Sequence, residues 1–129
     1  MFRSRALSYA ILAATEVAKR GDGAGIQAAN IAAACDLPTA HGAKIMSQLA
    51  KAHVFRSDRG ARGGFQLARA ANKITLLEIY EAVHGTLGQD AASSLPPALA
   101  KPVNAAFDAT YGVIRKRLEG VSLGDLMKK

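Results

Sequence analysis

The sequence feature that most limits the possible folds of this chain is the stretch from His53 to Leu67, HVFRSDRGARGGFQL. It begins and ends with β-branched and aromatic residues, Val54-Phe55 and Phe65-Gln66-Leu67, which are typical of short strands. The glycines between these runs allow a turn, because glycine reaches positive φ without steric cost. Three arginines lie in or beside the turn: Arg56, Arg59 and Arg62. The stretch therefore predicts a basic β-hairpin.

Two helical segments precede this hairpin. Residues 27–35 predict a short helix, and Asp36-Leu37-Pro38 predicts a turn, with Pro38 suited to the first position of the next helix. In that next helix, residues 38–52, the apolar Ile45, Met46 and Leu49 can pack inward while the opposite stripe is small, polar and basic. Two short helices joined by a tight turn and followed by a basic hairpin predict a winged helix-turn-helix.

The remaining segments predict further helices. Residues 4–19 have helical periodicity, Ile26 predicts a brief edge strand, and Thr75 to Glu78 has the spacing of a capping box, so a helix is expected from there to Gly85. A last helical turn is expected after Ser122, which is followed by Asp125 at the same spacing. The expected fold class is mainly α with a small β-hairpin wing, and the expected organisation is a DNA-binding domain (1–85), a linker (86–101) and a dimerisation helix with a C-terminal turn (102–129).

The long helix expected from Pro102 to Glu119 carries one apolar stripe. Its members recur at spacings of three and four: Val103, Phe107, Tyr111, Ile114 and Leu118. The stripe can pack on a second copy of the chain or lie back on the first helix, and dimerisation is the favoured interpretation.

The net charge of +7 is concentrated in the half that contains the hairpin. Residues 1–73 hold eleven Lys and Arg against four Asp and Glu, whereas residues 74–129 hold six of each. A basic half is typical of proteins that bind nucleic acid or an acidic membrane surface, or it merely keeps a protein soluble. No run approaches the roughly 18 apolar residues of a spanning helix, and the basic, apolar N-terminus continues with helical periodicity, so we expect a folded first helix and a cytoplasmic protein.

Candidate catalytic and metal-binding residues are few. The single cysteine, Cys35, excludes an intrachain disulfide and a multi-cysteine metal site, and it is interpreted as a small hydrophobe rather than a redox sensor. His41, His53 and His84 lie in different segments without ligand spacing. No nucleophile–base set, paired carboxylate site or phosphate-binding loop is present in the sequence, so no enzyme, no metal and no cofactor is expected.

The run SDRGARGGFQLARAANKITLLEIYEAVHG closely resembles the wing and following helix of the bacterial regulators that include IscR, NsrR and CymR, the Rrf-two family. The matching residues are Ser57, Arg59-Gly60, Gly63-Gly64-Phe65, Leu67-Ala68-Arg69, Ile74-Thr75-Leu76 and Gly85. The resemblance covers roughly residues 4–85. It implies a homodimeric winged-helix repressor that binds a pseudo-palindromic operator in double-stranded DNA.

The chain departs from this family at two places. Several members hold an iron–sulfur cluster with three linker cysteines, but residues 86–101 contain none, so a regulator without a cluster is expected. In the recognition helix, His41 and Gly42 stand where the family usually has an aromatic residue and a leucine. This departure leaves the operator sequence open.

The expected DNA contacts divide by groove. The start of the recognition helix should reach base edges, and Arg59 at the hairpin tip should enter an A·T-rich minor groove. The remaining basic and polar residues should contact phosphates, although Ser47 and Lys51 also fit a merely solvated face. The full set is Thr39, Ala40, His41, Ala43, Lys44, Ser47, Lys51, Arg56, Arg59, Gly60, Arg62, Arg3 and Arg5. Two alternatives remain: an adaptor that binds another protein, and a regulator controlled by a small ligand held between the DNA-binding domain and the dimer helix.

Overall fold

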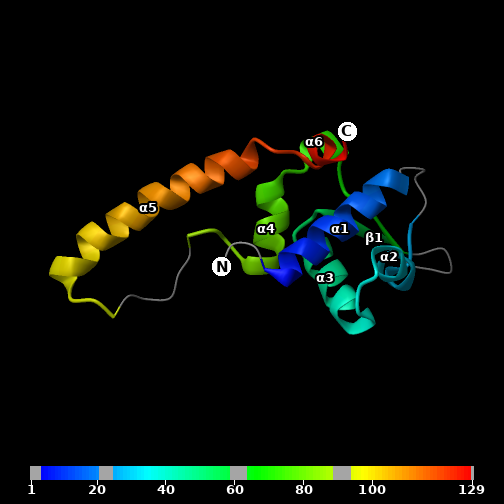
Figure 1. The fold of residues 1–129 in the computed structure, drawn as a ribbon, viewed down its shortest axis with the longest axis horizontal. Helices are drawn as coiled ribbons and strands as arrows, with labels where there is room; N and C mark the ends of the chain where they lie inside the picture. Colours follow the sequence, from blue (N-terminus) through cyan, green and yellow to red (C-terminus); the bar gives the residue numbers. More distant parts are fainter. Residues whose placement is uncertain (1–3, 21–24, 59–63, 89–93, 129) are drawn as a thin grey trace.

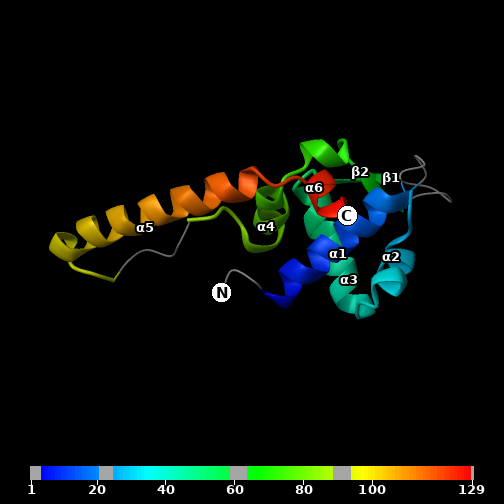
Figure 2. The same cartoon turned by 45° about the horizontal axis from the view of Figure 1, so that its top comes forward.

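The computed structural model describes residues 4–20, 25–58, 64–88 and 94–128. In these residues the chain is mainly helical with one two-stranded antiparallel sheet, which confirms the predicted fold class (Figures 1 and 2). The elements in order are α1 (Arg5–Arg20), α2 (Ala28–Cys35), α3 (Thr39–Lys51), β1 (Phe55–Asp58), β2 (Gly64–Leu67), η1 (Ala71–Lys73), α4 (Leu76–His84), α5 (Pro97–Glu119) and α6 (Leu123–Met127). Among the described residues, no helix is long and apolar enough to cross a membrane.

The core lies where α1, α2, α3 and α4 meet. Helix α1 contributes small residues, Ala10, Ala13 and Ala14, all fully buried, so that its neighbours approach its backbone closely. Larger side chains fill the remaining space, among them the fully buried Ile31 and Met46. Burial of this apolar surface is the main force that holds the helices together.

The hairpin forms as predicted, with Phe55 paired to Leu67 and Ser57 to Phe65. Ile26, which was expected to be a brief edge strand, bridges Phe65 through two backbone hydrogen bonds of 3.0 and 2.8 Å. Gly64 makes this approach possible, because a Cβ there would lie 2.6 Å from the backbone of Ile26 and its φ is +148°. The sheet is thereby fastened to the segment that leads into α2.

Helix α4 begins with the predicted capping box: the Thr75 hydroxyl accepts from the Glu78 amide, and the Glu78 carboxylate accepts from the Thr75 amide. The last turn, α6, has the same arrangement between Ser122 and Asp125, so both predicted caps are confirmed. Leu123 is fully buried in the core, and its amide donates to the carbonyl of Ile74 at 2.7 Å. The C-terminal turn therefore packs on the helix-turn-helix half rather than extending α5.

Helix α5 is a long arm that projects from the rest of the fold (Figures 1 and 2). The predicted start at Pro102 is wrong, because the helix begins at Pro97. Pro97 occupies the first helical turn, where a missing N–H costs nothing, and Ala98 to Lys101 are good helix formers. Pro102 lies inside the helix and removes only one backbone hydrogen bond from this exposed part of it.

Candidate nucleic-acid interface

The outer face of α3 is exposed over its whole length. The seven residues predicted to contact DNA from this helix are all exposed: Thr39, Ala40, His41, Ala43, Lys44, Ser47 and Lys51. The inward side is buried through Ile45, Met46 and Leu49, as the sequence predicted. The helix carries no acidic residue, so its free face presents hydroxyl, imidazole and ammonium groups without a neighbouring carboxylate of its own. Such a face suits a polyanion.

Local geometry sets the angle between α2 and α3. Asp36 adopts the left-handed conformation (φ 55°) and ends α2, and its backbone N–H donates back into the last turn. Gly42 is buried against α2, where an added Cβ would lie 3.1 Å from the Cβ of Ala32. The glycine that weakens α3 in isolation therefore allows the two helices to pack closely.

Arg56 occupies an exposed position on β1, the strand that follows α3. Its Nη2 donates to Oε1 of the cross-strand neighbour Gln66 at 2.8 Å, which holds the guanidinium along the sheet. Arg5 is exposed at the first residue of α1. The other basic residues predicted to contact DNA, Arg3, Arg59 and Arg62, and also Gly60, lie outside the described residues.

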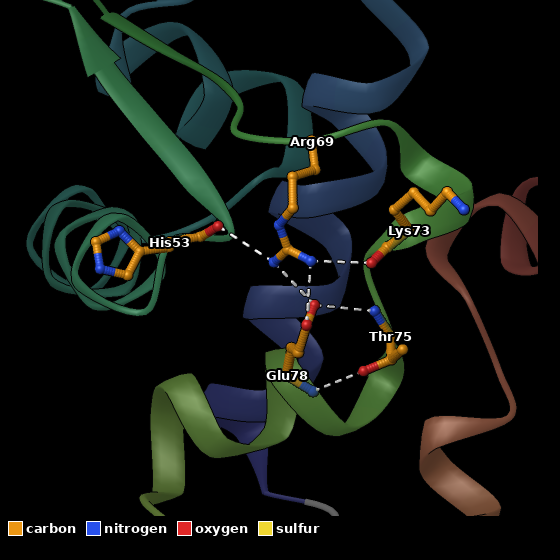
Figure 3. A network of polar contacts seen from close by, with 5 residues as sticks. All are labelled: His53, Arg69, Lys73, Thr75 and Glu78. Atoms are coloured by element: carbon orange, nitrogen blue, oxygen red, sulfur yellow. Dashed lines mark hydrogen bonds and ion pairs between the residues drawn. The ribbon is translucent and has the colours of Figure 1, made fainter.

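Arg69 connects three segments of the winged helix-turn-helix half (Figure 3). Its guanidinium forms two hydrogen bonds with the Glu78 carboxylate, at 3.1 and 3.0 Å. It also donates to the carbonyl of Lys73 at 2.9 Å and to the carbonyl of His53 at 3.3 Å. His53 follows α3 in the left-handed conformation (φ 63°), so the network connects the end of α3, the exit of the hairpin and the start of α4.

Arg69 is part of the sequence motif that resembles the family, but no role was predicted for it. The capping box at Thr75 could have indicated a partner for Arg69, because the acidic residue of such a box can also accept a hydrogen bond from a second donor. The structure shows that Glu78 serves both the cap and the arginine.

His41 and His84 line one hollow beside α3, whereas His53 lies outside it. His84 forms a 2.7 Å hydrogen bond through Nε2 with the Ser4 hydroxyl, which also accepts from the Leu7 amide at the start of α1. The His41 ring lies edge-on to Tyr9, with centroids 6.3 Å apart. In the part of the chain that the structure describes, no three His, Cys, Asp or Glu side chains are grouped so that they could hold one metal ion.

Cys35 is half-buried at the end of α2, and its thiol lies 3.5 Å from the Leu12 carbonyl. Burial, followed by the nearby Glu16 carboxylate, raises the pKa of the thiol above its ordinary value. A thiol with a raised pKa holds little thiolate at neutral pH, so the environment favours a packing role.

The apolar stripe of α5 divides into two parts. Val103 and Phe107 are exposed on the arm, with 36% and 55% of their surface accessible. Tyr111, Ile114 and Leu118 are half-buried, and the last two line a cavity of about 300 Å³ together with residues of α1 and α4. Only the C-terminal part of the stripe therefore faces α1 and α4, across this cavity, whereas Val103 and Phe107 lie exposed on the arm.

One ion pair fixes the base of the arm. Arg115 Nη2 lies 3.0 Å from Glu81 Oε2 of α4 and donates to the Leu87 carbonyl at 2.8 Å. The same carboxylate oxygen accepts from the Leu87 amide at 2.7 Å. The direction of α5 is therefore set by the Glu81 carboxylate of α4 and by the backbone of Leu87 in the turn that follows it.

Comparison with known proteins agrees with this arrangement. An HTH-type transcriptional regulator of Aquifex aeolicus is 36% identical over 81 residues, which are 63% of this chain and 56% of that protein. The HTH-type transcriptional regulator Rv1287 of Mycobacterium tuberculosis is 29% identical over 87 residues, which are 67% of this chain and 54% of that protein. This chain thus spans about half the length of these curated relatives.

Similarity to a solved structure extends over nearly the whole fold. The structure of CymR from Staphylococcus aureus is 26% identical, with a TM-score of 0.67 and a match to 98% of each chain. The model of the Rrf2 family, described as iron-dependent transcriptional regulator, matches residues 3–129. This chain belongs to the Rrf2 family of transcriptional regulators.

Proposed function

We propose that this chain is a sequence-specific DNA-binding regulator that acts as a homodimer, with α3 in the major groove and the hairpin in the adjacent minor groove. The observation that carries the proposal is the continuous exposed face of α3, which holds Lys44 and Lys51 and no acidic residue. Residues at the start of such a helix reach base edges, and a lysine there can donate to guanine. The network around Arg69 supports the proposal because it holds the hairpin and α3 in a fixed relation.

The homodimer is inferred from the arm. Leu99, Val103 and Phe107 recur at a spacing of four on α5, and all three are exposed. Large apolar side chains in such a row are typical of an interface between helices. A dimer would present two copies of α3 to half-sites roughly one helical turn of DNA, about 34 Å, apart.

A regulator without an iron–sulfur cluster fits the donor atoms of this chain. The family's description names iron, and clusters of this kind are held mainly by thiolates. The only cysteine is Cys35, which lies in α2, and residues 86–101 contain none. The residues present therefore do not fit a cluster, and no step of the proposed function passes through one.

The test is selection of genomic fragments by the purified chain, followed by affinity measurement on a selected and a shuffled fragment over a range of salt. We expect tight binding of the selected fragment and an affinity that falls steeply with salt. Arg59→Ala should weaken the selected fragment much more than the shuffled one, because minor-groove insertion depends on sequence. Weak binding without preference would favour the adaptor instead.

A further inference from the structure

A hollow of about 520 Å³ opens beside the recognition helix, between α1, α3 and α4. Its lining comprises Ala6, Tyr9, Ala40, His41, Lys44, Ile45, Gln48, Val83 and His84. Its volume lies within the range of about 300 to 1,000 Å³ in which proteins hold small molecules. Three of the lining residues, Ala40, His41 and Lys44, also belong to the set predicted to contact DNA.

The walls of this hollow combine an apolar surface with nitrogen donors. Ile45 is 3% exposed, and Val83 and Ala6 are half-buried, so these three supply an apolar floor. Lys44 brings an ammonium group, and the two histidines bring imidazole nitrogens that can donate hydrogen bonds. No Asp or Glu is among the lining residues. The balance of charge therefore favours an anion with an apolar body over a cation or a neutral sugar.

Both imidazoles are held in place by their neighbours. His84 is hydrogen-bonded to Ser4, and its ring centroid lies 4.9 Å from that of Tyr80. His41 lies edge-on against Tyr9. Donors that are already oriented lose less freedom when a ligand arrives, which favours binding.

We propose that this hollow binds a small organic anion, an aliphatic or aromatic carboxylate, and that the bound anion excludes DNA. The carboxylate would accept from Lys44 and the histidines, while the hydrocarbon part lies against Ile45 and Val83. Exclusion follows because Lys44 and His41 cannot contact the anion and DNA at the same time. This second step rests on the proposed function, whereas the binding step does not.

The binding step is tested without DNA. Benzoate and hexanoate are titrated into the full chain, with benzyl alcohol and 1-hexanol as neutral controls, and backbone and imidazole chemical shifts are followed by NMR. We expect saturable shifts centred on His41, Lys44 and His84, and roughly tenfold weaker binding of the alcohols, because charge-assisted hydrogen bonds are lost. Shifts that do not saturate, or that move His53 as much as His84, would overturn the site.

Two variants and one control sharpen this test. Val83→Phe should reduce the affinity for benzoate by filling the hollow, and His84→Gln should reduce it by removing an imidazole donor. His53→Asn, at an exposed histidine outside the hollow, should leave that affinity unchanged. Far-UV circular dichroism identifies any variant that fails to fold, and unchanged benzoate affinity in a folded His84→Gln protein would contradict the site.

The exclusion step is tested by adding benzoate to the complex with a selected DNA fragment. We expect benzoate to release the DNA from the natural chain, with less release from His84→Gln. Benzoate that binds without releasing DNA would refute exclusion. If the chain binds benzoate but shows no preference for any DNA fragment, the proposed function is wrong and the anion site remains supported. If the chain prefers particular DNA fragments but does not bind benzoate, only the anion site is wrong.

Discussion

The side chains of Arg69 and Glu78 meet at two points, with Nη1–Oε1 and Nη2–Oε2 distances of 3.1 and 3.0 Å. The arginine follows β2 and the glutamate lies in the first turn of α4, so the pair crosses from one element to the next. Because the same guanidinium donates to the carbonyl of His53, the position of the hairpin is coupled to the end of α3 (Figure 3).

Replacing Arg69 by alanine should destabilise the fold by about 1 to 2 kcal/mol, because hydrogen bonds to Glu78 and to two backbone carbonyls are lost together. Both side chains are more than a third exposed, which keeps the expected loss modest. The free energy of unfolding in urea measures it. Arg20→Ala is the control, since the Arg20–Glu16 pair connects only neighbouring turns of α1 and should contribute about 0.3 to 0.5 kcal/mol. Equal losses in the two variants would contradict a network role.

Gly64→Ala should destabilise the chain by about 2 to 4 kcal/mol, because the new Cβ would overlap the backbone of Ile26 and the residue would keep a positive φ. Gly112→Ala is the matched change in the exposed part of α5, where an added Cβ meets nothing within 4 Å. That second change should be neutral or stabilise by up to about 1 kcal/mol. The midpoint of thermal unfolding measures the effect of both changes. A Gly64→Ala protein that unfolds at the same temperature as the natural chain would show that the Ile26 bridge is dispensable.

The local parts of this fold could be predicted from the sequence. The apolar periodicity of α3 and the capping boxes of α4 and α6 depend on residues three or four positions apart, so the sequence pattern contains them directly. The exposed face of α3 follows from the same periodicity. The glycines and aromatic residues of the hairpin were sufficient to place its two strands.

The parts that sequence could not predict depend on contacts between distant residues. Arg115 and Glu81 are 34 positions apart, and nothing in either segment indicates the other. Burial of Leu123 requires the chain to turn back after α5, which no local pattern shows. The early start of α5 was missed because Pro96-Pro97 was interpreted as part of a loop, although proline fits the first turn of a helix.

Phe107→Ser should weaken the proposed dimer by roughly a hundredfold, because Phe107 is a large apolar residue with 55% of its surface exposed on the arm. Stability of the single chain should change little, since this residue is outside the core cluster. Sedimentation velocity over a range of concentrations measures the association. Asp108→Ser, at the next and also exposed position, is the control. A Phe107→Ser protein that remains as dimeric as the natural chain would place the interface elsewhere.

Cys35 should react with iodoacetamide more slowly than a free thiol between pH 7 and pH 9, because burial raises its pKa and lowers its thiolate fraction. The raised pKa also fixes how Cys35 affects stability. The stabilising contribution of its protonated thiol is fully present below the pKa of the thiol in the unfolded chain, and it is lost as the pH rises through the pKa in the folded chain. Cys35→Ala should leave DNA affinity unchanged. Alkylation faster than that of glutathione would instead indicate a reactive thiol.

The main hypothesis is that the exposed face of α3 recognises particular DNA sequences. Fluorescence anisotropy with a selected and a shuffled fragment at one fixed salt concentration tests it most directly, in the natural chain, in Lys44→Ala and in Lys101→Ala, whose exposed lysine lies on the α5 arm. We expect the natural chain and Lys101→Ala to bind the selected fragment at least about 10³-fold more tightly than the shuffled one. In Lys44→Ala, we expect a much smaller ratio between the affinities for the selected and the shuffled fragment. Equal affinity of the natural chain for both fragments, or an unchanged ratio in Lys44→Ala, would contradict the hypothesis.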